Sequence, residues 1–408
     1  MKKLMPLIYV VFAACTVQPI PMLRIGEWQG KLIREDGNHI IFNFEIKEKN
    51  DSLLWIIKNG EERIEVTDVL ENGDSLFVQM PVFESSFKLV KLGNNQLKGV
   101  WTKAASTGFL DMPFEATAGI TERFPVTTNA AKNITGKWSV RFFRADGSPR
   151  PAIAEFMQKG NDLSGTFITP TGDYRYLKGV VNGDSLQIST FDGSHAYFFK
   201  GYINSDSSIS KGFYYSGATG IEPWEAMKND TATLPDVAAM YMRDGEEKLS
   251  FSFRDLNGKQ VSITDERFKN KVVIVQIMGS WCPNCMDETA FLSTFYKKNK
   301  DRGVEIVALA YEYYEDFNLA VNSIRKFQKR FDVQYPMLVT GVTVTDTLRT
   351  EKTLPQLTKI KSFPSTIFIG KNGKVAKIHA GFEGPGTGSR YEALQKEFIN
   401  TVDQLLKQ

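Results

Sequence analysis

Two cysteines separated by two residues, Cys282 and Cys285, are the side chains in this sequence best suited to chemistry. They flank Pro283 and Asn284 and directly follow Trp281. Two thiols at this spacing can bind a metal, staple a small fold, or exchange electrons with another disulfide. The rest of the sequence distinguishes these three chemistries.

A zinc site would need two further Cys or His ligands near this pair. The chain has three cysteines and three histidines, and His39, His195 and His379 are far apart in sequence. A disulfide between residues three apart closes a very small loop and would stabilise the fold little. We therefore favour thiol–disulfide exchange and expect neither a metal nor a cofactor.

The N-terminal residues have the pattern of an export signal. The chain opens with MKK, and residues 4–14 form an apolar run too short to span a bilayer as a helix. This predicts a signal peptide over residues 1–14. The run ends in FAAC, which resembles the lipobox of bacterial lipoproteins, with Phe12 in place of the usual aliphatic residue. The resemblance implies that Cys15 is lipid-modified; the alternative is an ordinary signal peptide with an incidental cysteine.

Length and composition are those of a multidomain globular protein. A chain of 408 residues suggests two or three domains. Hydrophobic residues make up 42% and charged residues 24%, and the net charge of +3 includes no long run of one sign. This balance indicates neither a nucleic-acid-binding stripe nor a polybasic membrane patch, so we expect no nucleic-acid partner.

The first half of the chain contains an internal duplication. The stretch GEWQGKL at Gly26 matches GKWSVRF at Gly136, and NGDSL occurs twice. FESSFKLVKLG at Phe83 aligns with FDGSHAYFFKG at Phe191. Because all these matches share an offset of about 110 residues, we infer two repeats.

Each copy, placed at 24–118 for repeat 1 and 134–228 for repeat 2, contains short strand-like runs separated by turns. Turn pairs such as Asn182-Gly183 interrupt the runs about every ten residues. This spacing favours an antiparallel meander that is closed into a barrel or strongly curved. One of the runs, at 174–181, is predicted to be a single strand.

The pattern changes after a polar segment at 229–248, the predicted linker. Over 249–408, apolar runs alternate with helical patterns, which is typical of an α/β domain. Val272–Met278 is continuously apolar, as a buried parallel strand would be. A helix is predicted at 283–298, directly after this strand and a short loop.

This order places the two cysteines at a strand-to-helix turn. Pro283 suits the first position of a helix, so Cys282 is expected at the helix N-terminus. Free backbone N–H groups and the helix dipole favour a thiolate there. We therefore predict that Cys282 is the attacking thiol and that Cys285 resolves the mixed disulfide.

The stretch WCPNC at Trp281, together with FPST at Phe363 before a later strand, resembles the thioredoxin fold. FRDLNGKQVSI at 253–263 is similar to the opening hairpin of the membrane-tethered TlpA/ResA-like branch. The resemblance covers the chain from about residue 249 and does not include the repeats. The predicted architecture is therefore a C-terminal α/β thioredoxin fold preceded by two repeated antiparallel all-β domains.

The resemblance implies roles for matching residues. Pro364 corresponds to a cis-proline that faces the dithiol and leaves the backbone of Phe363 free to pair with a substrate; the alternative is a proline that merely starts a strand. Glu288 matches a glutamate near the active site of this branch. It shares a helix face with Cys285, so it is a candidate proton donor or acceptor. Alternatively it is a first-turn carboxylate favoured by the helix dipole, a role that Asp287 could also fill.

Gln276 stands where thioredoxin has a buried aspartate, six residues before the first cysteine. Because glutamine cannot ionise, this departure shifts weight to Glu288. The resemblance also implies that Cys282 and Cys285 form a redox-active disulfide. The predicted substrate groove is lined by Trp281, Pro283, Asn284 and Phe363.

The sequence therefore predicts a lipid-anchored thiol–disulfide oxidoreductase of the cell envelope, facing the periplasm or the exterior. The branch implies a reductase of protein disulfides that is recharged by a membrane electron donor. An oxidase or isomerase is the alternative within the same chemistry. A different class of function is an envelope binding lipoprotein whose repeats recognise a ligand or partner, with the redox domain accessory.

Overall fold

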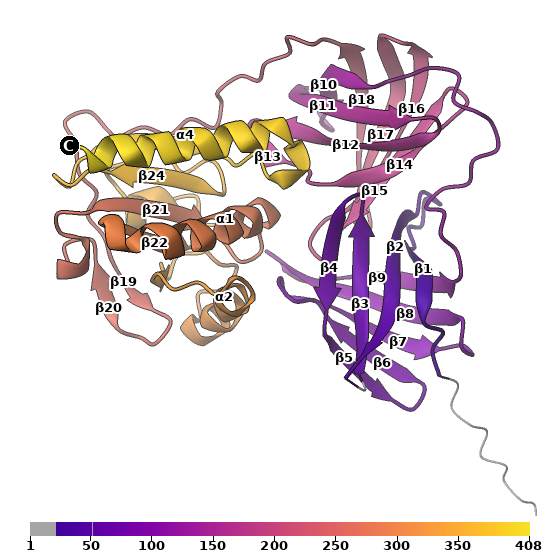
Figure 1. Ribbon diagram of the computed structural model, residues 1–408, viewed down its shortest axis with the longest axis horizontal. Helices are drawn as coiled ribbons and strands as arrows, with labels where there is room; N and C mark the ends of the chain where they lie inside the picture. Colours follow the sequence, from indigo (N-terminus) through magenta and orange to yellow (C-terminus); the bar gives the residue numbers. More distant parts are fainter. Residues whose placement is uncertain (1–21, 51) are drawn as a thin grey trace, which may run out of the picture.

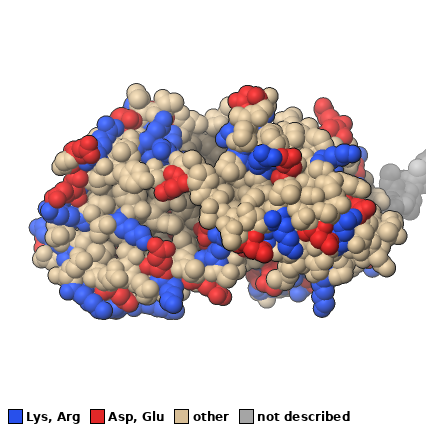
Figure 2. Space-filling view, turned by 90° about the horizontal axis from the view of Figure 1, so that it is seen from above, with Lys and Arg blue, Asp and Glu red and all other residues tan. Residues whose placement is uncertain are grey.

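The computed structural model describes residues 22–50 and 52–408. It contains two all-β units, one for each repeat, followed by a C-terminal α/β unit (Figure 1). The predicted signal peptide and Cys15 lie outside the described residues. Within the described residues, no helix is long and apolar enough to cross a membrane. On the face shown in Figure 2, acidic and basic side chains are interspersed, as expected for a net charge of +3.

Repeat 1 forms one antiparallel sheet in the order β4-β3-β2-β1-β9-β8-β7-β6-β5. Its strands are β1 (Gly26–Leu32), β2 (Ile40–Lys49), β3 (Ser52–Asn59), β4 (Glu62–Val66), β5 (Asp68–Asn72), β6 (Ser75–Gln79), β7 (Ser85–Lys91), β8 (Gln96–Ala105) and β9 (Gly108–Ala118). Alternate residues of each strand point inward, as Trp28 and Leu32 of β1 do. The interior is filled by large aromatic side chains, including Phe42, Trp55 and Phe87.

Repeat 2 is a closed antiparallel meander, because β11 pairs with both β10 and β12. Its strands are β10 (Gly136–Phe143), β11 (Pro149–Lys159), β12 (Asp162–Thr169), β13 (Gly172–Asp173), β14 (Leu177–Asn182), β15 (Ser185–Phe191), β16 (Ala196–Ser205), β17 (Ser208–Ser216) and β18 (Gly220–Lys228). Its core is also aromatic, with Trp138, Phe167 and Phe199 buried.

The single strand predicted at 174–181 is wrong at its start. β14 begins at Leu177, and Arg175 adopts φ 58°, a left-handed conformation that is unusual for a residue with a side chain. The irregular backbone between β13 and β14 is accompanied by a buried polar network around Arg175, described below. Tertiary contacts therefore override the strand pattern at this point.

The C-terminal unit has a seven-stranded sheet in the order β20-β19-β23-β22-β21-β24-β25. Its strands are β19 (Ser252–Asp255), β20 (Gln260–Ser262), β21 (Val272–Met278), β22 (Val304–Ala310), β23 (Met337–Val339), β24 (Ser365–Ile369) and β25 (Val375–Ala380). Its helices are α1 (Pro283–Asn299), α2 (Phe317–Phe331), α3 (Arg349–Thr353) and α4 (Ser389–Leu406). The fold class predicted from the sequence, an α/β thioredoxin fold after two all-β units, is confirmed.

The central strand β21 is buried on both faces, which explains its uniformly apolar sequence. Alternate residues such as Ile274 and Met278 pack with α1, α2 and α4. Residues of the opposite face, such as Val275 and Ile277, pack with the linker residue Met240 and the segment around α3. This packing fixes the loop between β21 and α1 at the edge of the sheet.

The two repeats share one core. Phe191, at the end of β15, enters repeat 1, where its ring centroid lies 4.3 Å from that of Phe42 and 5.2 Å from that of Trp101. The Asn59 side chain donates to the backbone carbonyl of Phe191 at 2.7 Å and accepts from its N–H at 3.2 Å. Repeat 1 is therefore completed by a side chain of repeat 2.

Repeat 1 contacts the C-terminal unit through the loop between β6 and β7. Phe83, between β6 and β7, packs edge-on against Phe327 of α2 with ring centroids 6.2 Å apart. The neighbouring Glu84 accepts hydrogen bonds from Ser323 and Lys326 of α2, both at 2.9 Å. The aligned residues Phe83 and Phe191 thus both dock on a neighbouring unit.

Candidate active site

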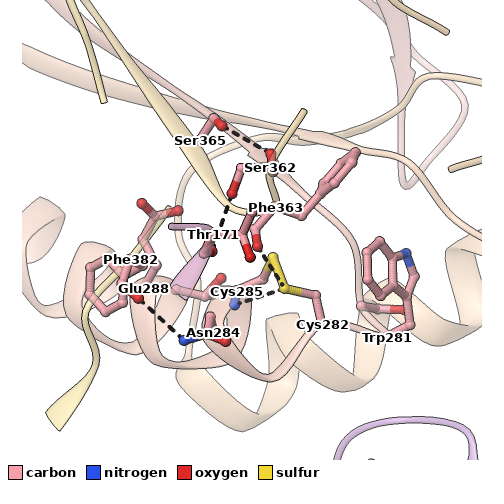
Figure 3. The surroundings of a disulfide bond; sticks show 12 residues. Thr171, Trp281, Cys282, Asn284, Cys285, Glu288, Ser362, Phe363, Ser365 and Phe382 are labelled. Carbon is pink, nitrogen blue, oxygen red and sulfur yellow. Dashed lines mark hydrogen bonds between the residues drawn. A yellow bond between two sulfur atoms is a disulfide. The ribbon is translucent and has the colours of Figure 1, made fainter. Parts of the chain in front are cut away.

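Cys282 and Cys285 form a disulfide at the start of α1 (Figure 3). Cys282 is the N-cap residue of α1, and its Sγ accepts a hydrogen bond from the N–H of Cys285 at 3.2 Å. Pro283 occupies the first turn, where its missing N–H costs no hydrogen bond. In the reduced form, this arrangement supplies a hydrogen bond and the helix dipole to a thiolate at Cys282.

The peptide bond between Phe363 and Pro364 is cis, the isomer that the resemblance implies. The carbonyl oxygen of Phe363 lies 3.5 Å from Sγ of Cys282 (Figure 3). The ring of Trp281 packs edge-on against that of Phe363, with centroids 5.4 Å apart. The loop before β24 therefore faces the dithiol directly.

Glu288 is buried behind the dithiol, one turn along α1. It accepts hydrogen bonds from Thr366 Oγ1 at 2.5 Å and from Gln276 Nε2 at 2.8 Å. Burial raises the pKa of Glu288 to about 7, although both hydrogen bonds act to lower it. The carboxyl group is thus suited to exchange a proton near neutral pH. Gln276, at the position of the thioredoxin aspartate, donates a hydrogen bond to this glutamate.

Sequence reasoning missed Glu312, which holds the loop before the nucleophile. Its carboxylate accepts from the Ser280 N–H at 2.9 Å and from the Ser280 hydroxyl at 2.6 Å. The indole N–H of Trp281 donates to the carbonyl of Tyr311 at 2.8 Å. Burial raises the pKa of Glu312 to about 7. The signal was available, because Glu312 follows β22 and the carboxyl ends of adjacent parallel strands meet at one edge.

Repeat 2 lies over the dithiol. The Asp173 carboxylate accepts from Asn284 Nδ2 at 3.2 Å and from the N–H of Gly384 at 2.6 Å. The hydroxyl of Ser362 donates to the carbonyl of Thr171 at 3.2 Å (Figure 3). The predicted groove residue Asn284 is therefore engaged by the protein's own repeat.

Arg175 joins all three units in one buried network. Its Nε and Nη2 donate to the two carboxylate oxygens of Asp287 at 2.8 and 2.9 Å. It also donates to Asp192 at 3.1 Å and to Glu62 of repeat 1 at 2.6 Å. Burial raises the pKa of Asp287 to about 6, and the Arg175 charge opposes the rise. Asp287 thus serves an interface between units. Neither Asp287 nor Glu288 lies in the first turn of α1, so the alternative of a first-turn carboxylate is wrong for both.

Arg175 was also missed from the sequence, although the duplication contains a signal. Counting back from the shared NGDSL, Arg175 and Asp173 correspond to Glu65 and Arg63 of repeat 1. The charges are reversed, so the repeat fold itself does not require them. A charge that differs between two copies of one fold indicates a contact made by one copy alone.

The structure brings together every predicted site residue within its described part. The cysteines, Trp281 and the cis-proline loop meet at the start of α1, and Glu288 lies behind them. A thioredoxin fold with a dithiol at a helix N-terminus, facing a cis-proline, defines a thiol–disulfide oxidoreductase.

Comparison with known proteins agrees with this class. The Redoxin family model matches residues 233–394. A thiol-disulfide oxidoreductase ResA from Bacillus thuringiensis subsp. konkukian is 30% identical over 134 residues, covering 33% of this chain and 68% of the relative. The ResA of Halalkalibacterium halodurans is 26% identical over 161 residues, or 39% of this chain and 77% of the relative. Through its C-terminal domain, the chain belongs to the ResA family of thiol-disulfide oxidoreductases.

Among solved structures, a thiol:disulfide interchange protein of the thioredoxin family from Chlorobium tepidum aligns with a TM-score of 0.30 and 21% identity. The alignment covers 39% of this chain and 95% of that chain. The C-terminal unit, called the redox domain from here on, is an enzyme that catalyses thiol–disulfide exchange.

Proposed function

We propose that the chain is a lipid-anchored reductase of protein disulfides in the cell envelope, acting through Cys282 and Cys285. The observation that carries this proposal is the Cys282 sulfur, which lies at the N-terminus of α1 and faces the loop of the cis-proline. The lipid anchor at Cys15, the periplasmic or exterior location and the membrane electron donor rest on the resemblances described above.

The reaction transfers two electrons from the dithiol to the substrate. The Cys282 thiolate attacks one sulfur of the substrate disulfide, forms a mixed disulfide and releases the other sulfur as a thiolate, which takes up a proton. The Cys285 thiol then loses its proton and attacks Sγ of Cys282. The second substrate thiol leaves and the Cys282–Cys285 disulfide forms, ready to be reduced again by the membrane donor.

Glu288 is the proposed acceptor of the Cys285 proton. It follows Cys285 by three residues on α1, so the two side chains share a helix face. Its raised pKa lets the carboxylate take up a proton at neutral pH and release it in the next cycle. Glu312 has a different role: it positions Ser280 and thereby the loop that carries Cys282.

The alternative of a ligand-binding barrel gains no support from the repeats. Their interiors are filled by stacked aromatic side chains, such as Phe44 on Trp55 in repeat 1 and Phe167 on Phe199 in repeat 2. The proposed domain limits remain 24–118, 134–228 and 249–408, with the linker at 229–248.

The decisive experiment traps the mixed disulfide. Cys285→Ser should accumulate covalent complexes with envelope proteins through Cys282, whereas the matched Cys282→Ser variant should not. The parent chain should reduce insulin, and its reduction potential separates a reductase from an oxidase or isomerase. Absence of both a trapped partner and insulin reduction would contradict the proposal. Cys15→Ser should move the protein out of the membrane fraction.

A further inference from the structure

The dithiol is inaccessible in this arrangement of the three units. Cys282 is 4% exposed and Cys285 is fully buried, and Pro283 and Asn284 between them are buried as well. A thiolate must approach a disulfide sulfur directly in order to attack it, so a protein disulfide cannot reach this site. Part of the cover must move before the redox domain can act.

The cover is formed by residues 170–173, the turn after β12 together with β13, which we call the cap turn. It contacts both walls of the site: Thr171 accepts from Ser362 of the cis-proline loop, and Asp173 accepts from Asn284 of the dithiol helix. A Cβ atom added to Gly172 would lie 3.0 Å from the Asn284 side chain, so the fit is close. The cap turn occupies the groove predicted to receive a substrate chain.

Arg175, two residues after the end of the cap turn, holds the cap turn against the redox domain. Its guanidinium binds both carboxylate oxygens of Asp287, two residues after Cys285 in sequence. Bidentate pairing of this kind fixes orientation as well as distance. Removal of the guanidinium would leave buried carboxylates of three units facing one another without a cation.

The contacts of the cap turn and the linker allow the redox domain to separate from repeat 2. The contacts described for the cap turn and Arg175 are hydrogen bonds and ion pairs, which water can replace when the units separate. The apolar contact of Phe83 of repeat 1 with Phe327 of α2 must also break if the redox domain leaves both repeats. Residues 233–237 of the linker form no helix or strand and are mostly exposed, while Ala232 and Met240 on either side are buried. Five extended residues span roughly 17 Å, which is enough to uncover the dithiol without unfolding either unit.

We propose that repeat 2 is an autoinhibitory cap on the redox domain, locked by the Arg175–Asp287 pair, and that exchange with substrates requires the redox domain to undock. The inference rests on the proposed function, in which Cys282 attacks the substrate. It assigns the duplicated β region a regulatory role on that same site.

Two variants of the full chain test the cap by independent means. Arg175→Gln removes the lock from the side of repeat 2. Gly386→Ala adds a wedge from the side of the redox domain, because its Cβ would lie 2.8 Å from the backbone carbon of Arg175 while every charge stays in place. The matched control is Arg141→Gln, which removes an exposed ion pair with Glu225 within repeat 2.

The measurement is the alkylation rate of Cys282 in the reduced protein, followed by mass spectrometry of its peptide and normalised to the denatured chain. We expect the parent and Arg141→Gln to react at least about tenfold more slowly than the denatured chain. Each opening variant should accelerate alkylation about tenfold and insulin reduction with it. Thermal melting confirms folding, and if Arg175→Gln fails to fold, Gly386→Ala decides.

The cap is overturned if the parent thiol reacts as fast as that of the denatured chain, or if a folded Gly386→Ala variant leaves the rate unchanged. A failure of the proposed function has a different signature. In that case the variants expose Cys282 to alkylation, but neither they nor the parent reduce insulin or trap a partner.

Discussion

Repeat 2 contacts its two neighbours through surfaces of opposite character. Against repeat 1 it inserts Phe191, whose fully buried ring stacks on Phe42 in a core that both repeats share. Against the redox domain it presents Arg175 and Asp173, which make hydrogen bonds and ion pairs. Separation from repeat 1 would expose apolar surface, whereas separation from the redox domain exposes groups that water solvates. The first contact is a permanent part of the fold and the second is suited to open.

The aligned residues Phe83 and Phe191 show the same difference between a strong and a weak interface. Phe83 lies in the loop before β7 and Phe191 is the last residue of β15, before β16, and both dock on another unit. Phe191 enters the centre of a barrel-like core, while Phe83 lies on the outer surface of α2. One duplicated element therefore serves two interfaces of different strength.

The largest expected effect comes from Phe191→Ala. Loss of a buried phenylalanine from a packed core costs about 3–5 kcal/mol, so the free energy of unfolding should fall by that amount. Phe83→Ala should cost roughly half as much, because its ring has fewer buried partners, and should instead speed alkylation of Cys282. Urea denaturation and thiol alkylation of both variants measure the difference. Equal loss of stability in the two would remove the distinction between the interfaces.

Two neighbouring carboxyl groups on α1 provide the second test, because Asp287 faces repeat 2 whereas Glu288 faces only the redox domain. The pKa of Glu288 in the folded protein, about 7, exceeds its ordinary value of 4.5. Its contribution is therefore fully present below pH 4.5 and is lost as the pH rises through 7. Glu288→Gln should be more stable than the parent by about 2–3 kcal/mol at pH 8 and equal to it at pH 4.

The same variant should slow insulin reduction about 10- to 100-fold at pH 7, since the Cys285 proton loses its acceptor. The matched control is Asp287→Asn at the neighbouring carboxyl group. It should change docking without altering the part of the pH dependence of insulin reduction that reflects proton transfer from Cys285. Parallel stability curves for Glu288→Gln and the parent would show that Glu288 titrates normally.

Docking of the redox domain should weaken as the pH rises. The packing of Phe191 in the core of repeat 1 should not depend on pH. Burial raises the pKa of Asp173 and of Asp287 to about 6 from 3.8, and it also raises the pKa of Glu62. Asp173 and Asp287 therefore favour docking through a contribution that is fully present below pH 4 and is lost as the pH rises through 6. Asp192 acts in the opposite sense because, although burial acts to raise its pKa, His195 and Arg175 lower it. The charged and titratable groups of this network and facing it are Glu61, Glu62, Lys103, Asp173, Arg175, Tyr176, Asp192, His195, Asp287, Glu383 and Tyr391.

Small-angle scattering at pH 4.5 and 7.5 measures this effect, together with alkylation normalised to the denatured chain at each pH. We expect the undocked fraction to be about tenfold larger at pH 7.5. The control is Arg175→Gln, which should be extended at both values. A parent whose scattering is the same at both pH values would contradict the expected linkage.

The smallest effect is expected at the rim of the docking surface. Arg390 of α4 pairs with Glu155 of β11 at 2.6 Å, with both side chains partly exposed. An ion pair of this kind contributes about 0–1 kcal/mol, so Arg390→Gln should change the alkylation rate of Cys282 less than about threefold. An acceleration as large as that of Arg175→Gln would mean that the lock is not localised at Arg175.

The chemistry of the dithiol and the fold that carries it could be predicted from the sequence because both are local. The apolar strand Val272–Met278, the short loop and Pro283 determine where α1 begins, and they place Cys282 at its N-terminus. The repeats were equally visible, because two copies of one pattern reinforce each other. The spacing of turns was enough to indicate meanders.

The contacts between the units could not be predicted from local sequence patterns. Arg175 stands within an apolar, strand-like run, and its partner Asp287 is 112 residues away in sequence. Neither residue has a local pattern that indicates the other. For Glu312 the sequence indicates a position at the edge of the sheet that carries the dithiol, but its contact with Ser280 depends on the order of strands in the sheet, which periodicity does not reveal.

The insertion of Phe191 into repeat 1 has a consequence for how the chain is made. During synthesis repeat 1 emerges first, yet its core includes aromatic rings of repeat 2, among them Phe191, which lies 73 residues after the last strand residue of repeat 1, Ala118. Until β15 arrives, the gap beside Phe42 and Trp101 is open and apolar. Folding of the first repeat is therefore completed only by its successor. A truncated chain that ends before residue 191 should bind chaperones during export, although every strand of repeat 1 is present.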